Sequence, residues 1–522
     1  MDTLLARSAT SSTTQEQRGA LLLGTFLLAK ALFLFWYIAS GSLSLAPDEA
    51  QYWTWSRHLD LGYYSKPPGI AWQIALGTWI WGHNELGVRF VSLVLGFVQP
   101  WLLVALARGC GLRPLNALWA GWIWAISPIG LIGSIMAITD VGMIFFWTIA
   151  SLPWMRALFS EERRCRWELV GLAIAVGALF KWPIYSLWLL ILLLWPLAPL
   201  SKEGLVRGLV LSLLGLLPSL AWNSQHDWAT YRHVFQTLAG GHGGELGTTA
   251  LFQGNLLEFL AAQLLLLTPL FFGLLVGGWR LLWRSSGQPL SPPERVLLLS
   301  SLLPLGLTAL LACFQKMQGN WCDFALVQGV VAVSWYGQER QPRQGLAVGG
   351  SLLALGMAAL LLLLPPLQQK GALSLPYIPF KHQLGWDKMA EPLERAGYDP
   401  ERHFLFAARY QTTSLLAFYA PGQRDSYFFN LFGLRYNQFC YWPTMADKEL
   451  GKEGFFALTE QPRATPERLE ELRQRLLPHF EQVDYVGETA LLKRGQTAAT
   501  TLHLFHARGY LGTEPPVSTP HF

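Results

Sequence analysis

Charged residues are scarce in this sequence. Of 522 residues, 14% are Asp, Glu, Lys or Arg, while 52% are hydrophobic. Soluble domains carry about 25% charged residues, so the composition excludes an ordinary soluble enzyme of this length. It indicates instead a polytopic membrane protein, in which 24 Trp and 29 Phe suit membrane interfaces and apolar helix packing.

Other features that would direct the interpretation elsewhere are also missing. The net charge is +5, yet Lys and Arg are spread over short loops, so we expect no nucleic acid partner. The five cysteines lack metal-type spacing, and only Cys313 and Cys322 are close enough in sequence to suggest a bridge. The first apolar run is not followed by a small-residue cleavage site, so we expect it to be a retained span. No solenoid-type repeat is present.

Eleven apolar runs are candidates for helices that cross the roughly 30 Å hydrocarbon core. They lie at residues 20–42, 86–107, 114–133, 141–159, 168–181, 183–199, 208–222, 256–279, 296–314, 323–336 and 346–366. With the N-terminus inside, most Lys and Arg fall in cytoplasmic loops. The outer loops before residue 367 hold only Arg57, Lys66, Arg232 and Lys316, which is the bias of the positive-inside rule.

The composition changes after residue 366, where short strand-like and helical runs alternate. "HFLFAA" and "SYFFN" predict strands, whereas "QTTSLLAFYA" and "TPERLEELRQRLLPHF" predict helices, the second with Thr465 as its N-cap. The expected domains are residues 1–366, a transmembrane domain with catalytic outer loops, and residues 367–522, a soluble periplasmic α/β domain. The predicted fold class is an α-helical polytopic membrane protein of about 11 transmembrane helices with this small extracytoplasmic domain.

Acidic, basic and aromatic residues gather in the predicted outer loops. "LAPDEAQYW" places two carboxylates directly after the first span, and later loops add further polar groups. A carboxylate next to apolar surroundings can act as a base, and Lys or Arg can stabilise a phosphate leaving group without a metal. Aromatic rings suit a sugar or an isoprenoid. Together these groups predict glycosyl transfer from a lipid phosphate.

Several motifs carry a resemblance to a known family. "PDEAQYWTWSRHLDLGYYSKPP", "ITDVGMIFFWTIA", "WNSQHDW" and "GNWCDFALVQG" resemble the dolichyl-phosphate-mannose protein mannosyltransferase superfamily, in particular its bacterial branch with the lipid A aminoarabinose transferases. The resemblance implies the GT-C membrane glycosyltransferase fold. It implies that Asp48 is the catalytic carboxylate, that Lys66 and Lys181 hold the donor phosphate, and that Asp140 assists. Gln51 departs from the family pattern, so Arg57 is expected to supply a cation near the phosphate.

Each of these residues also has a structural alternative. Glu49, grouped with the catalytic carboxylates, could cap a helix that starts at the motif, and Lys66 could reach the interface without a ligand. Tyr63, Tyr64 and His226 are predicted to contact an acceptor or a metal. We expect Lys30, in the middle of the first span, to pair with an acid or backbone carbonyls. Three further residues, Tyr410, Gln411 and Tyr419, are expected to be ordinary helix positions.

Three classes of function follow from this pattern. The leading hypothesis is an enzyme that moves a sugar from a polyprenyl-phosphate donor to a lipid, glycan or protein acceptor on the outer face of the inner membrane. A polyprenyl-lipid or small-molecule transporter or flippase is the alternative, although its charges would lie near the midplane of the bilayer. A scaffold subunit is the third. Sugar, acceptor and any divalent metal stay open, because "DE" lacks the spaced acid of a DxD motif.

Overall fold

The computed structural model describes residues 2–238, 254–284, 289–340, 344–371, 373, 380–460, 463–494 and 497–515. These residues form two compact units. The first unit comprises residues 1–36, 89–220 and 243–360, and the second comprises residues 37–88, 221–242 and 361–522. The first unit is helical, and the second contains the sheet. The predicted domain boundary at residue 366 stays a prediction.

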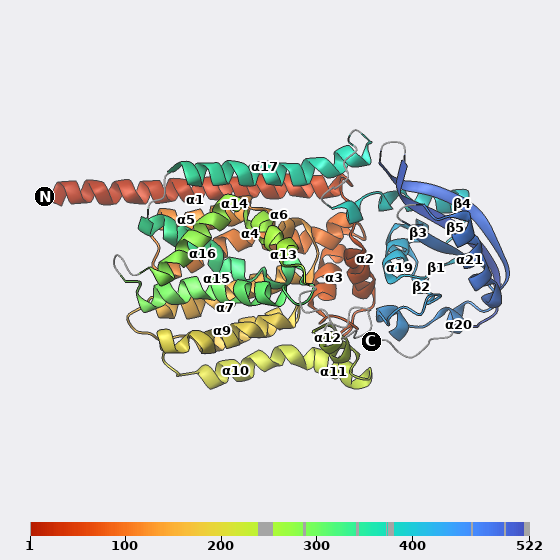
Figure 1. The fold of residues 1–522 in the computed structure, drawn as a ribbon, viewed down its shortest axis with the longest axis horizontal. Helices are drawn as coiled ribbons and strands as arrows, with labels where there is room; N and C mark the ends of the chain where they lie inside the picture. The colour runs from red at the N-terminus through yellow and green to blue at the C-terminus, as the bar shows by residue number, and fades with distance from the viewer. Residues whose placement is uncertain are drawn as a thin grey trace. The chain divides into compact units, whose positions relative to one another are not determined.

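The first unit is a bundle of apolar helices. Its helices, some of which run into the second unit, are α1 (Asp2–Ala39), α4 (Glu85–Gly109), α5 (Pro114–Ile126), α6 (Pro128–Ile135), α7 (Thr139–Leu158), α8 (Trp167–Ala178), α9 (Ser186–Leu194), α10 (Leu205–Leu213), α11 (Leu217–Gln225), α13 (Leu256–Leu267), α14 (Pro269–Arg280), α15 (Pro292–Leu311), α16 (Ala325–Arg340) and α17 (Gln344–Gln369). Helix α8 packs between α7 and α10. Helix α16 packs on α15, α14 and α5 (Figure 1).

Six helices in the described part of the chain are long and apolar enough to cross a membrane. Two further pairs, Pro114–Ile126 with Pro128–Ile135 and Leu256–Leu267 with Pro269–Trp283, would raise the number to eight if each bent pair is one span. The chain is therefore a multi-pass membrane protein. The predicted count of eleven is not confirmed, because segments such as α8 are short: 12 residues extend only about 18 Å, less than the hydrocarbon thickness.

Lys30 contacts the backbone at the break between α5 and α6. Helices α5 and α6 meet at a 61° bend next to Pro128, which lacks the N–H that would continue the helix. The Lys30 ammonium donates to the carbonyl oxygens of Ala125, at 2.9 Å, and Gly130, at 3.2 Å. These acceptors flank the break, so Lys30 has the expected pairing with backbone carbonyls.

Cys313 and Cys322 are both free thiols, so the bridge suggested by their spacing is absent.

The second unit is built on a five-stranded mixed sheet of order β2-β1-β3-β5-β4. The strands are β1 (Phe404–Ala407), β2 (Ser426–Phe428), β3 (Gly454–Glu460), β4 (Phe480–Arg494) and β5 (Thr497–Tyr510), and the helices are α2 (Pro47–Arg57), α3 (Gly69–Trp81), α12 (Ala229–Leu238), α18 (Ala390–Arg395), α19 (Tyr410–Tyr419), α20 (Met445–Lys448) and α21 (Pro466–Leu476). Strand β1 is parallel to β2 and β3, whereas β5 is antiparallel to β3 and β4.

Two helices cover opposite sides of this sheet, α19 and α21 (Figure 1). Phe404 and Phe406 of β1 share a core with Leu472 and Leu476 of α21, while α19 contacts β1 and β2. Thr465 caps α21 by accepting the N–H of Arg468 at 3.3 Å. The predicted fold class, a polytopic helical protein with a small C-terminal α/β part, is confirmed apart from the number of spans.

Helix α2, which begins at the "PDEA" motif, packs against α19. Trp53 of α2 meets Phe418 of α19 edge to face, with ring centroids 4.9 Å apart. The N–H of Leu45, just before α2, donates to the Tyr419 hydroxyl at 2.6 Å. The first loop is thereby fixed to α19, a helix that packs on the sheet.

Candidate functional site

The two adjacent carboxylates of "PDEA" have different environments. Glu49 is fully buried, and its Oε2 accepts the backbone N–H of Ala46 at 2.9 Å. This bond closes the N-terminus of α2 as in a capping box, so the capping role considered for Glu49 is present. Asp48, one position earlier in the first turn, reaches solvent instead. Asp48 is therefore the carboxylate that a substrate can contact.

Positive groups and a phenol surround Asp48. Burial within the dense protein around it raises the pKa of Asp48, and the charges of Lys66, Arg435 and His382 lower it part of the way back. Tyr410, the first residue of α19, is hydrogen-bonded to Arg435, and burial, with the charge of Asp48, raises the pKa of Tyr410 to about 12. Tyr410 is thus more than the ordinary helix position expected of it. The group combines a basic carboxylate with cations that suit an anion.

Arg435 is the cation that contacts Tyr410 in this group, and the sequence did not predict it. It follows Leu434 in "LFGLRYNQF", between β2 and α20, and its Nη1 lies 3.4 Å from Nδ1 of His233. Its only sequence signal is an Arg placed among aromatic and aliphatic residues in a loop. That signal does not predict a site on its own, because only the fold brings this loop to the N-terminus of α2.

Arg57, the cation predicted for the phosphate, lies elsewhere. It ends α2, whereas Asp48 begins it, and nine residues of helix separate them by about 13 Å. Its guanidinium stacks on Trp53 at 5.0 Å, donates to the carbonyl of Gln423 and is 3.8 Å from a carboxylate oxygen of Asp425. Arg57 therefore attaches α2 to the segment after α19, and its predicted contact with the donor stays a prediction.

Tyr63, Tyr64 and His226 are packed in aromatic surroundings. Tyr63 is fully buried and stacks on Trp55 with centroids 4.6 Å apart. The ring of His226 stacks on that of Trp222 with centroids 4.0 Å apart, and Nδ1 of His226 lies 2.7 Å from the carbonyl oxygen of Trp222. The Tyr64 hydroxyl is buried and has no hydrogen-bond partner among the described residues. The Tyr64 hydroxyl is thus available to a ligand or a water.

Asp140 and Lys181 form an ion pair in the first unit. The Lys181 ammonium lies 2.6 Å from Oδ1 of Asp140, and the two side chains are only 16% and 7% exposed. Asp323 of the "GNWCDF" motif is close enough to interact electrostatically with both. Asp140 and Asp323 also line a narrow cavity of about 40 Å³. Two buried carboxylates thus share one lysine, and the predicted assisting and phosphate-binding roles stay predictions.

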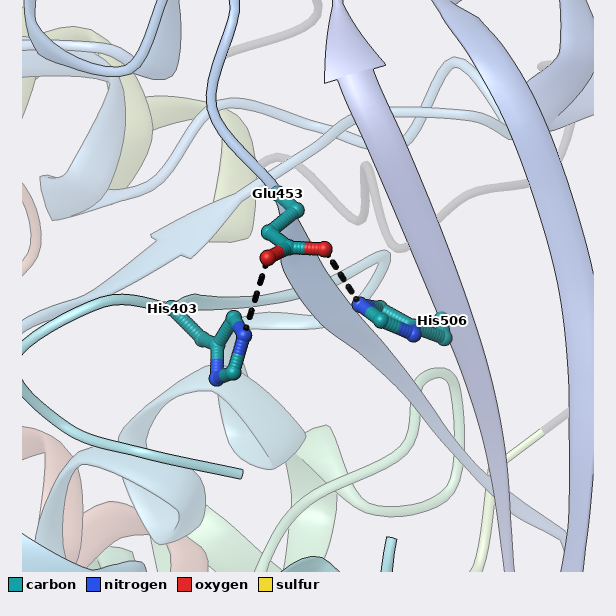
Figure 2. A group of neighbouring side chains, drawn as sticks. All are labelled: His403, Glu453 and His506. Carbon is teal, nitrogen blue, oxygen red and sulfur yellow. Dashed lines mark hydrogen bonds and ion pairs between the residues drawn. The ribbon is translucent and has the colours of Figure 1, made fainter. Parts of the chain in front are cut away.

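One cluster in the described part of the chain has the composition of a metal site, namely His403, Glu453 and His506 (Figure 2). The Nε2 atom of His403 is 3.3 Å from Oε1 of Glu453, and that of His506 is 3.1 Å from Oε2. The Nδ1 atom of His403 accepts the N–H of Asp399 at 2.9 Å, and the Arg508 guanidinium lies 3.3 Å from Nδ1 of His506. In both rings Nδ1 therefore faces a donor and acts as the acceptor, and Nε2 is the atom next to Glu453.

This proton arrangement opposes a metal at the same atoms. A histidine that binds metal through Nε2 donates from Nδ1, but here both Nδ1 atoms face donors. The guanidinium groups of Arg402 and Arg508, each 3.9 Å from Glu453, add positive charge. Burial and the Arg508 charge lower the pKa of His506, which keeps it neutral. We interpret the cluster as a polar contact that joins β5 to the segments just before β1 and β3.

The known proteins that this chain is similar to agree with the resemblance seen in the sequence motifs. Residues 65–222 match the family model described as dolichyl-phosphate-mannose-protein mannosyltransferase. The lipid A galacturonosyltransferase RgtD of Rhizobium johnstonii is 33% identical over 320 residues, which are 60% of this chain and 64% of that protein. The undecaprenyl phosphate-alpha-4-amino-4-deoxy-L-arabinose arabinosyl transferase of Pseudomonas aeruginosa is 32% identical over 218 residues, 38% of this chain and 39% of that protein. The match thus spans less than two thirds of either relative.

The fold has a counterpart among solved structures. ArnT from Cupriavidus metallidurans bound to undecaprenyl phosphate superimposes with a TM-score of 0.60 and 13% identity, covering 95% of this chain and 99% of ArnT. The apo form of the same protein gives a TM-score of 0.57. At this identity the likeness concerns the fold alone. The resemblance to the dolichyl-phosphate-mannose-protein mannosyltransferase family is therefore confirmed in residues 65–222, and the chain has the fold of ArnT.

Proposed function

We propose that this chain is an integral membrane glycosyltransferase that moves a sugar from a polyprenyl-phosphate donor to an acceptor on the outer face of the inner membrane. The observation that carries the proposal is the group around Asp48. A solvent-accessible carboxylate with a raised pKa is flanked by Lys66 and Arg435, and Tyr410 holds Arg435 by a hydrogen bond. A base next to fixed cations is what transfer from a phosphate requires.

In the proposed reaction the acceptor hydroxyl attacks the anomeric carbon of the donor sugar. The new bond joins the acceptor oxygen to this carbon, and the bond from the carbon to the phosphate oxygen breaks. The hydroxyl proton passes to Asp48, whose raised pKa makes it a stronger base than an exposed aspartate. Polyprenyl phosphate leaves with the bonding pair, and Lys66 and Arg435 stabilise its growing negative charge.

The names of the relatives narrow the substrates that we propose. RgtD is a lipid A galacturonosyltransferase, the relative from Pseudomonas acts with undecaprenyl phosphate and an aminoarabinose, and ArnT has been solved with undecaprenyl phosphate bound. We therefore propose a polyprenyl-phosphate-linked sugar as donor and a lipid A-type glycolipid as acceptor. In this proposal the Asp48 group faces the periplasm, in agreement with the Lys and Arg distribution.

Mass spectrometry of lipids from cells that lack the gene tests this function. We expect a lipid A species to lose one sugar and a polyprenyl-phosphate sugar to accumulate, and the accumulating lipid identifies the donor. Complementation with the parent chain should restore the modified lipid, whereas Asp48→Asn at equal abundance should not. Unchanged lipid A and polyprenyl-linked sugars in the deletion strain would contradict the proposal.

A further inference from the structure

The second unit contains a cavity separate from the Asp48 group. It has a volume of about 340 Å³ and lies between the C-terminal half of α2 and the segment that runs from β2 to α20. We call it the Trp442 cavity and define it by the lining residues Thr54, His58, Asp425, Tyr427, Trp442 and Glu514. Its volume lies within the range of about 300–1,000 Å³ in which proteins hold small molecules.

Aromatic rings form much of the cavity wall. Trp442, Tyr427, Tyr436 and Phe439 all line it, and Trp442 and Tyr427 are only partly buried. Phe439 supports Trp442 edge to face at 5.4 Å, and the ring of His58 lies 4.7 Å from it. Supported rings with accessible surface can receive the C–H face of a sugar, since the aromatic face is electron-rich.

The polar groups of the cavity complement hydroxyl groups. Asp425 is held in place by His58, at 3.2 Å, and by Arg57, and Glu514 supplies a second carboxylate. Hydrogen bonds from hydroxyls to carboxylates are stronger than bonds between neutral groups. Buried Thr54 and Asn430 add neutral polar atoms to the lining. The cavity therefore offers acceptors at several points around an aromatic wall.

The charge balance disfavours other ligands. The lining contains one lysine, Lys448, and two carboxylates, Asp425 and Glu514, so a phosphate would meet no excess of positive charge. A hydrocarbon chain would displace water from the carboxylates of Asp425 and Glu514 and offer them no hydrogen bond in return, which costs free energy. A neutral compound with a ring and many hydroxyls satisfies both parts of the lining.

We propose that the Trp442 cavity binds a neutral saccharide unit of the acceptor, a proposal that rests on the proposed glycosyl transfer. Helix α2 connects the two sites, because it carries Asp48 in its first turn and Thr54 about 9 Å further along its axis. A sugar held in the cavity would hold a neighbouring acceptor hydroxyl near Asp48. The cavity thus determines which acceptor is aligned for reaction.

Direct binding to the full chain in nanodiscs tests the proposal. The probe is N,N′-diacetylchitobiose, with inorganic phosphate and a saturated fatty acid as comparators, and sugar-headed detergents are avoided. We expect saturable binding of the disaccharide by calorimetry, weakened at least tenfold in Trp442→Ala and several-fold in Glu514→Gln. Trp228→Ala is the matched control, because Trp228 is an exposed tryptophan of the same unit outside the cavity lining, and it should bind as the parent does.

The proposal is overturned if the parent does not bind the disaccharide, if Trp442→Ala binds it equally well, or if phosphate or the fatty acid binds more tightly. Undecaprenyl phosphate binding, measured on the same samples, separates this result from the proposed function. A parent that binds undecaprenyl phosphate but no disaccharide contradicts only the cavity proposal. A parent that binds the disaccharide but no undecaprenyl phosphate contradicts only the proposed function. In a transfer assay, Trp442→Ala should raise the acceptor KM tenfold with kcat nearly unchanged.

Discussion

Asp48 and Glu49 differ because successive residues of a helix point about 100° apart. Glu49 turns back to the N–H of Ala46 and is buried, whereas Asp48 faces solvent next to Lys66 and Arg435. One carboxylate thereby fixes the start of α2, so that the other is held in place for a substrate.

Replacing Asp48 by Asn keeps the shape of the side chain and removes its charge and its basicity. We expect kcat to fall about 100-fold or more, since loss of a general base typically costs this much, while undecaprenyl phosphate affinity changes little or increases. The measurement is single-turnover transfer in nanodiscs, with melting temperature as the folding control. Transfer near the parent rate by a folded Asp48→Asn variant would remove Asp48 from the mechanism.

The acid side of the pH profile should depend on two cations. Because burial raises the pKa of Asp48 and the base must be deprotonated, kcat/KM should fall as the pH drops through this raised pKa. Lys66 and Arg435 lower that pKa, so Lys66→Met and Arg435→Met should each move the acid limb to higher pH. The shift should be larger for Lys66, which is the stronger of the two influences. An acid limb that stays in place in both variants would show that neither cation acts on the base.

The buried pair of Asp140 and Lys181 permits a double-mutant test. Lys181→Met leaves Asp140 and Asp323 without their cation, and removing one partner of a buried pair typically costs about 3–5 kcal/mol. Adding Asp140→Asn should regain most of this loss, as judged by thermal unfolding in nanodiscs. If Lys181 instead serves only the donor, Lys181→Met should unfold like the parent and lose donor affinity.

The site was partly predictable at the residue scale. Asp48 and Lys66 lie in one predicted outer loop with a specific motif, so local sequence was enough to select them. Arg435 and Tyr410 come from a segment whose approach to α2 depends on tertiary packing. The pairing of Arg57 with Asp425 depends on the same packing, which the departure at Gln51 from the family pattern does not reveal.

At the scale of elements, Arg57 joins the C-terminal end of α2 to the segment after α19. Arg57→Met removes an exposed ion pair with Asp425, and such pairs contribute little stability, about 0–1 kcal/mol. We expect donor KM to stay within about twofold of the parent, whereas Arg435→Met should raise it at least tenfold. Steady-state kinetics with a polyprenyl-phosphate sugar compares the two. A large increase in donor KM for Arg57→Met would restore the phosphate role predicted from the sequence.

Most elements follow from local sequence, but their continuity does not. Apolar runs located the helices, and alternation of strand and helix patterns located β1, β2, α19 and α21. The 61° bend at Pro128 and the 103° bend after Leu267 cannot be predicted from local sequence, because they depend on which groups bond to the backbone atoms that the break leaves unpaired. Lys30 does this at the first bend, through a contact about 100 residues away in sequence.

For the whole molecule, the orientation in the membrane is the prediction with the widest consequences. The excess of Lys and Arg in alternate loops predicts that a reporter fused after Pro366 is periplasmic. Paired alkaline phosphatase and fluorescent protein fusions at this position provide the measurement, with active phosphatase and a dark fluorescent protein as the expected result. The reverse result would place the Asp48 group in the cytoplasm and exclude a periplasmic acceptor.

The second unit is assembled from three separate stretches of chain, residues 37–88, 221–242 and 361–522, and this has a consequence for its biosynthesis. Tyr64 bonds to Gln438, 374 residues later, and Asp48 meets Arg435 only when that later segment has been made. During translation the early loop is therefore made long before its partners. A chain that stops before residue 435 therefore has Asp48 without Arg435, so the proposed site is completed only after the third stretch has been made.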